Sequence, residues 1–274
     1  MTLLAVLSGL RTKNPKGLGA TLTVDLFRNE VFAIACVVMA LVFMALFGST
    51  LFFPLFFQTV MGTSAAQSGL LTTPLMAGVV IASIVNGRLL LRSGRYKMTQ
   101  IVGVLIAAAA LAALAWATSV AQRFTEIEIA LFSLGIGVGL VMPNMTIAVQ
   151  NALPAIHRGV GTAVLSFGRS LGGLVGIAGA GAIFTQLLHA DGAFTSVSAK
   201  LAESHTPHQL PAEADMTLGP IYRNSIAITL VVAALIVTIA LLILLRLPEL
   251  PLRYQTLSDE TSSDLPDLPE GKPM

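Results

Sequence analysis

Long apolar runs dominate the pattern of hydrophobic and polar positions along this chain. A membrane-crossing helix needs about 20 mostly apolar residues, and six stretches reach that length, over residues 31–57, 69–90, 99–117, 127–148, 160–188 and 224–245. A helix pairs its own backbone N–H and C=O groups in lipid, which a lone strand cannot do. The pattern therefore predicts an all-α integral membrane protein built as a six-helix transmembrane bundle.

Composition excludes several classes of protein. Of the 274 residues, 55% are hydrophobic and only 11% are charged, whereas about 25% are charged in an ordinary soluble domain. This deficit argues against a water-soluble enzyme, a disordered chain and a basic nucleic-acid binder. The sequence also contains no phosphate-binding GxxxxGK[ST] loop, no GxSxG elbow and no Cys/His set with metal-ligand spacing. We therefore expect no enzyme activity, no cofactor and no metal site.

The distribution of Lys and Arg predicts the orientation, because these residues favour the cytoplasmic side of a membrane. Most of them lie before the first run, between the second and third runs, between the fourth and fifth runs, or after the sixth run, which places them all on one side of the membrane. They are Arg11, Lys13, Lys16, Arg28, Arg88, Arg92, Arg95, Lys97, Arg158, Arg246, Arg253 and Lys272. The opposite side holds Arg123, Lys200 and Arg223. Both termini are therefore predicted to be cytoplasmic.

The same reading divides the chain into segments. Residues 1–29 form a basic cytoplasmic segment whose apolar first ten residues are either the remnant of a preceding helix or an interfacial segment. Residues 30–188 hold the first five helices, 189–223 an outer loop, periplasmic or extracellular, and 224–246 the sixth helix. The acidic, proline-punctuated tail, 247–274, is predicted to be disordered because it has little apolar surface to bury.

Arg169 is the charged residue in the centre of an apolar run. It lies roughly 15 Å from the inner end of the fifth run, near the membrane midplane. A central arginine costs about 2.5–3.5 kcal/mol and normally faces the bundle interior with a partner. It either ties its helix to polar groups of neighbouring helices or lines a substrate or coupling pathway. No Asp, Glu, Lys or His occupies the centre of any run, so a carboxylate partner must come from another chain or a missing half.

Uncharged polar residues and glycines are the remaining candidates within the runs. Gln58, Asn144 and Gln150, like Asn86, either form interhelical hydrogen bonds, worth about 0.6 kcal/mol each, or contact a substrate in a cavity. Small residues at four-residue spacing predict close helix packing. These are Gly135, Gly139, Gly168, Gly172 and Gly176.

The segment NGRLLLRSGRYK, between the second and third runs, concentrates positive charge. It contains Gly87, Arg88, Arg92, Gly94, Arg95 and Lys97. The cations either bind anionic lipid headgroups or bind neighbouring helix ends as a conformational latch. The two glycines are expected to permit a tight turn between antiparallel helices.

Several segments resemble one transporter family. LFFPLFFQTVMGTSAAQSGLLTTPLMAG, GRLLLRSGRYK, and GIGVGLVMPNMTIAVQNALP followed by HRGVGTAVLSFGRSLGGLVGIAGAGAIF resemble the second half of the major facilitator superfamily, and more narrowly its fourteen-span drug:proton antiporter branch. The resemblance covers about residues 22–246. It implies half of a major facilitator fold, with Arg169 in the penultimate helix. The superfamily's loop signature has an acidic residue where this chain has Leu91, which argues against the usual acid-based latch.

The resemblance also implies a function. It suggests the C-terminal part of a proton-coupled multidrug efflux transporter in the cell inner membrane, exchanging an amphipathic drug-like molecule for protons. With six of fourteen spans, the chain is expected to need a missing N-terminal half or a companion chain and to be inactive alone. The alternative is a non-transporting membrane assembly partner or a decayed transporter relic. Neither interpretation involves a nucleic acid.

Overall fold

The computed structural model describes residues 26–93, 96–120, 124–190 and 212–248, all in helices or short connections. The elements are α3 (Glu30–Thr50), α4 (Phe52–Thr59), α5 (Ala65–Leu71), α6 (Thr73–Ser93), α7 (Tyr96–Val120), α8 (Phe124–Ala152), the 3-10 turn η1 (Ala155–His157), α9 (Arg158–Ala190) and α11 (Ala212–Leu245). Six segments are long and apolar enough to cross a membrane. The predicted all-α bundle with six spans is therefore confirmed.

The helix boundaries differ from the predicted ones in physically simple ways. The first apolar run is divided between α3 and α4, because Pro54 has no N–H to donate to the carbonyl of Thr50. Leu51 between them keeps helical angles, with φ −63° and ψ −32°. At the other end, α11 already begins at Ala212, inside the predicted outer loop. The predicted N-terminal stub, the middle of that loop and the acidic tail lie outside the described residues.

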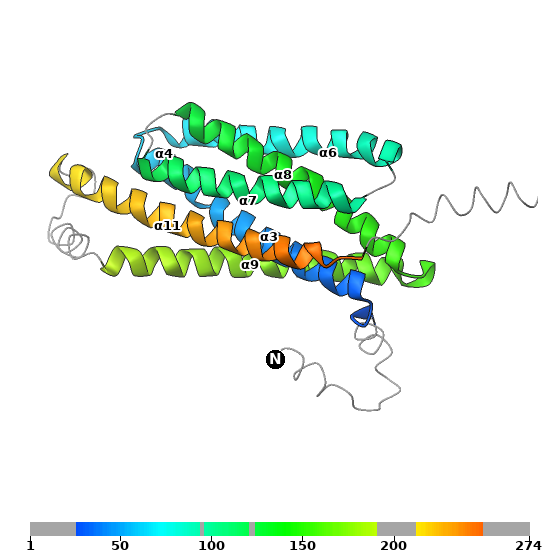
Figure 1. Ribbon diagram of the computed structural model, residues 1–274. Coiled ribbons are helices and arrows are strands. Elements are labelled where there is room, and N and C mark those ends of the chain that lie inside the picture. The colour runs from blue at the N-terminus through cyan, green and yellow to red at the C-terminus, as the bar shows by residue number, and fades with distance from the viewer. Residues whose placement is uncertain (1–25, 94–95, 121–123, 191–211, 249–274) are drawn as a thin grey trace, which may run out of the picture.

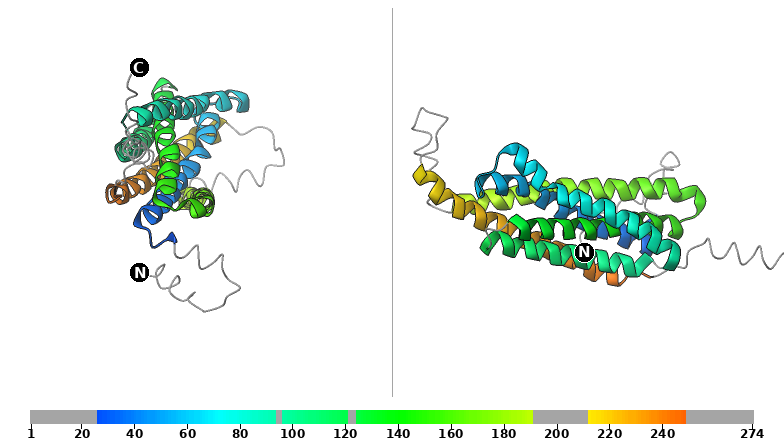
Figure 2. Two further views of the ribbon diagram at one scale, coloured as in Figure 1. Left: turned by 90° about the vertical axis from the view of Figure 1, so that its right-hand side faces the viewer. Right: turned by 90° about the horizontal axis from the view of Figure 1, so that it is seen from above.

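The helices run side by side along a common direction (Figure 1). Seen along the bundle, α3 and α8 lie in the middle, α7 and α11 on one side, and α6 and α9 on two flanks (Figure 2, left). α6 packs mainly against α8, and α9 packs mainly against α3. Within the most apolar 18-residue stretch of each span, 22% is buried for α6 and 28% for α9, compared with 33% for α11 and 56% for α3, α7 and α8. The two flank helices therefore offer large unpartnered surfaces.

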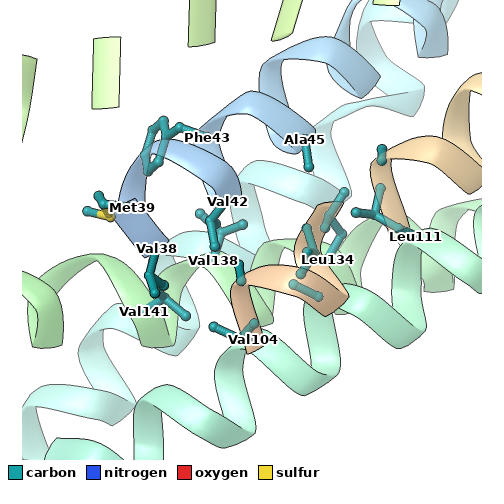
Figure 3. Packing of buried hydrophobic residues seen from close by; sticks show 14 of the residues in the cluster. Val38, Met39, Val42, Phe43, Ala45, Val104, Leu111, Leu134, Val138 and Val141 are labelled. Carbon is teal, nitrogen blue, oxygen red and sulfur yellow. The ribbon is translucent and has the colours of Figure 1, made fainter. Parts of the chain in front are cut away.

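Aliphatic side chains from α3, α7 and α8 meet in the centre of the bundle (Figure 3). The labelled residues include Val38, Val42, Val104, Leu111, Leu134, Val138 and Val141, each at most 2% exposed. Because lipid tails are as apolar as these side chains, the fit between the helices, more than hydrophobic transfer, selects this arrangement.

Candidate functional site

α9 places Arg169 against the aromatic side of α3. Its guanidinium carbon lies 5.2 Å from the centroid of the Phe43 ring, which is the geometry of a cation–π contact. One turn further along α9, Gly173 leaves room for the ring of Phe47, because a Cβ atom there would come within 2.9 Å of a ring carbon. Arg169 is partly exposed. The structure thus assigns the central cation an aromatic neighbour that sequence analysis did not identify.

The acidic residues of the described helices all lie near helix starts. Glu30 is the first residue of α3, Glu126 and Glu128 lie in the first five residues of α8, and Glu213 and Asp215 lie in the first four of α11. Arg169 is the twelfth residue of α9, about 16 Å from the start of that helix. Within the described part of the chain, no carboxylate therefore lies at mid-helix depth beside this arginine.

Asn144 lies between α8 and α6, where it forms a reciprocal amide pair with Asn86. The Nδ2 of Asn86 donates to Oδ1 of Asn144 at 3.1 Å, and the Nδ2 of Asn144 donates to Oδ1 of Asn86 at 2.8 Å. Asn144 also donates to the carbonyl of Leu140 at 2.9 Å. The side chain of Asn86 is 1% exposed, and that of Asn144 is 0% exposed. This geometry favours the interhelical interpretation of Asn144 over contact with a substrate.

Gln58 and Gln150 make different contacts from Asn144. The Nε2 of Gln58 in α4 donates to the Oγ of Ser68 in α5 at 3.1 Å, so this side chain links two short helices. Gln150 is an exposed residue in the last turn of α8. Neither side chain forms a hydrogen bond with Arg169.

The two glutamines and Arg169 also lie at different levels of the bundle. Phe52, near Gln58, packs on Phe184 with ring centroids 4.9 Å apart, and Phe184 is about 22 Å along α9 from Arg169. At the other end, Gly161 of α9 lies against Val149, the neighbour of Gln150, and is about 12 Å from Arg169. The predicted polar candidates therefore do not form one cluster.

Glycines on α9 allow its backbone to approach the backbone of α3 closely. A Cβ atom on Gly172 would overlap with the carbonyl oxygen of Ala40, and one on Gly176 would overlap with that of Met44. Gly168, in the same stripe, differs because its Cβ would lie 3.8 Å from the nearest oxygen, an ordinary contact. The approach of the two backbones therefore depends on the two glycines nearer the middle of α9.

A second set of glycines brings α8 onto α6. A Cβ atom on Gly135 would overlap with the carbonyl oxygen of Leu75, and one on Gly139 would meet that of Val79. A third crossing, between Gly137 of α8 and Gly103 of α7, was not predicted from the sequence; there each glycine lies against the backbone of the other. The four-residue spacing of Gly135 and Gly139 predicted the face of α8 that packs on α6, but not the face that packs on α7.

The predicted loop between the second and third runs is mostly helix. α6 continues to Ser93 and α7 begins at Tyr96, so Gly87 and Arg88 lie on the last turns of α6, and Lys97 on the first turn of α7. The expectation that Gly87 makes a turn is therefore wrong. A Cβ atom on Gly87 would meet nothing within 4 Å, because the helix exposes this position. Gly94 and Arg95 lie outside the described residues, and the side chain of Arg92 is not among those described.

A buried amide on α7 was also not predicted from the sequence. Gln100 is 0% exposed, and neither its Nε2 nor its Oε1 has a hydrogen-bond partner. A buried polar group without a partner costs about 1–3 kcal/mol. Gln100 lies at the edge of an apolar run, where polar residues are common, so the sequence did not indicate that its side chain would be buried.

Comparison with known proteins identifies the family. The profile of the Major Facilitator Superfamily matches residues 3–177. An uncharacterised MFS-type transporter of Mycobacterium tuberculosis is 31% identical over 261 residues, covering 92% of this chain and 36% of that protein. The multidrug transporter protein MdtP of Bacillus subtilis is 36% identical over 163 residues, covering 58% of this chain and 29% of MdtP. A tetracycline resistance determinant of Streptomyces rimosus is 34% identical over 163 residues, covering 60% of this chain and 47% of that protein.

The fold is similar to part of a solved transporter. The crystal structure of the E. coli fucose:proton symporter aligns with a TM-score of 0.59 at 20% identity, covering 81% of this chain and 50% of the symporter. The chain therefore spans between 29% and 50% of the length of these four proteins. The six spans and the profile match lead to one conclusion: this multi-pass membrane protein belongs to the Major Facilitator Superfamily, a family of transporters and not of enzymes.

Proposed function

We propose that this chain is the C-terminal six-helix half of a proton-coupled multidrug efflux transporter of the fourteen-span branch. The observation that carries the proposal is the similarity to MdtP and to the tetracycline resistance determinant, whose names record multidrug transport and tetracycline resistance. The sequence motifs quoted above support the same branch. The exported compound would be amphipathic and drug-like, and protons would drive its exchange.

A second half is needed for transport in this proposal. Substrate sites of such transporters form near the midplane between two helix repeats, which rock against each other. α6 and α9 are the least buried spans of this bundle, and Arg169 lies partly exposed on α9. These surfaces would meet an N-terminal half or a companion chain. The described residues hold no carboxylate at mid-helix depth, so the proton-binding acid would come from that partner.

A transport assay tests this proposal. We expect the purified chain, reconstituted into proteoliposomes with an imposed pH gradient, to show no tetracycline accumulation above that of empty vesicles. The full-length tetracycline resistance determinant of Streptomyces rimosus, reconstituted in parallel, provides a control for intact gradients and correct reconstitution. Robust gradient-driven accumulation by the chain alone would refute its role as half of a transporter.

The predicted orientation is part of the proposal and has its own test. Because most Lys and Arg residues lie on one side, both termini of the chain would be cytoplasmic. A green fluorescent protein fused after Met274 is expected to fluoresce, and alkaline phosphatase inserted after Lys200 is expected to be active, since each reporter works only in its own compartment. The opposite pattern, with a dark terminus and an inactive insertion, would reverse the orientation.

A further inference from the structure

Three side chains form a mixed cationic and aromatic cluster where α9 crosses α3. The rings of Phe43 and Phe47 are tilted by 39° with their centroids 5.7 Å apart, and the guanidinium of Arg169 lies over Phe43. Phe43 is 5% exposed, whereas Phe47 is 43% exposed. Gly173 provides the space in which the Phe47 ring lies. The cluster therefore combines a buried ring, an accessible ring and a partly exposed cation.

The contact with Phe43 leaves most of the binding capacity of Arg169 unused. A guanidinium carries five N–H donors in a planar fork, and the face of an aromatic ring attracts its charge without accepting those hydrogen bonds as an oxygen would. The acidic residues of the described helices all lie near helix starts. Within the described residues, no acidic side chain lies at this depth to accept hydrogen bonds from the guanidinium of Arg169.

An anionic oxygen pair is the group that complements this arrangement best. Carboxylates and similar anions accept two parallel N–H bonds from arginine, and such charge-assisted bonds are short and strong. A ligand that also has an aromatic body could lay it against the exposed ring of Phe47, since aromatic pairs favour offset or edge-on contact. A cationic ligand would meet like charge at the same point.

The geometry points to a binding site for amphipathic anions, in which Arg169 holds one carboxylate or sulfonate and Phe47 contacts an attached aromatic body. This inference names a substrate class for the proposed efflux function and rests on it, because α9 must border the substrate pathway. It assigns Arg169 to ligand selection, whereas the proposed function alone requires only that α9 meets the second half.

A pair of fluorescent probes that differ by one charged group tests the site. The anionic probe is 1-anilinonaphthalene-8-sulfonate, and the neutral probe is N-phenyl-1-naphthylamine, which has the same aromatic skeleton without the sulfonate. Binding is titrated on the full chain in nanodiscs of zwitterionic lipid, with protein-free nanodiscs subtracted. Arg169→Gln is expected to weaken binding of the anionic probe roughly tenfold, in line with the loss of a charge-assisted hydrogen bond. Binding of the neutral probe is expected to stay within about twofold of the unmodified chain.

Two further variants separate ligand binding from structural effects. Arg158→Gln removes an arginine from the first turn of the same helix, outside the cluster, and is expected to leave both probes unaffected. Arg169→Lys keeps the charge but loses the planar fork, so it should weaken the anionic probe less than Arg169→Gln does. Thermal unfolding followed by circular dichroism checks that each variant retains its fold.

Two results would overturn the inference. One is equal binding of the anionic probe by the unmodified chain and Arg169→Gln. The other is an equal loss of both probes in folded Arg169→Gln, which would make the arginine a packing residue. Either result leaves the efflux proposal standing, because that proposal is judged by the proteoliposome assay. Active transport by the chain alone would contradict the half-transporter role without affecting the probe measurements.

Discussion

Replacing Gly172 with alanine is expected to lower the free energy of unfolding by about 2 kcal/mol, the scale typical of overpacking in a well-packed interior. The new Cβ atom would overlap with the carbonyl oxygen of Ala40. That oxygen belongs to the backbone of α3 and cannot rotate away, so α9 must move outward. The separation would weaken the main contact by which α9 is held to the bundle.

Unfolding by sodium dodecyl sulfate in mixed micelles, followed by circular dichroism, measures this effect. Gly179→Ala is the matched control, because it lies on the same helix and a Cβ atom there would meet nothing within 4 Å. Alanine favours a helix over glycine by roughly 1 kcal/mol, so the control is expected to be neutral or slightly stabilising. Equal stability of the two variants would show that close approach at Gly172 is unimportant.

Asn144→Leu is expected to lower the free energy of unfolding by about 1.5 kcal/mol. Leucine has the same branched heavy-atom skeleton as asparagine, so the principal loss is the reciprocal amide pair with Asn86. Asn86 is 1% exposed and would keep a buried amide without this partner, which costs about 1–3 kcal/mol. Measured interhelical hydrogen bonds in membranes reach about 1.7 kcal/mol, which places the expected value near the upper end.

A double-mutant cycle separates the pair from packing changes. Asn86→Leu with Asn144→Leu removes both amides, so no unpaired group remains, and the double variant is expected to lose less stability than the sum of the single variants. Gln150→Leu, at an exposed position on the same helix, is the control and should change stability by less than about 0.5 kcal/mol. Additive losses in the cycle would argue against a direct interaction between the two asparagines.

Apolar length was sufficient to predict the six spans, but not how each one ends. The extension of α6 to Ser93 was missed because the glycine and arginines that follow Asn86 were interpreted as a loop. In the structure, Asn86 pairs with Asn144 inside the bundle, so this part of the chain is anchored as helix. Local composition could not reveal a partner that lies 58 positions away in the sequence.

The candidate site was likewise predictable from the sequence only in part. The central place of Arg169 followed from counting residues, since helical rise converts position into depth. Its position over Phe43 did not, because α3 contains several phenylalanines and only the crossing of α9 on α3 selects one. Glycine spacing likewise predicted packing faces but not their partners, which depend on the backbones that approach them.

The sequence by itself determined the helical class and the number of spans, because lipid requires every backbone polar group to be paired within its own segment. It also determined that the central charge is an arginine with no acidic residue in the middle of any apolar run. Only the tertiary structure decided that Asn144 faces α6, that Gly172 meets Ala40 and that Arg169 lies over the ring of Phe43. These contacts join residues far apart in the chain, and in lipid they are selected by the fit between helix surfaces and not by hydrophobicity.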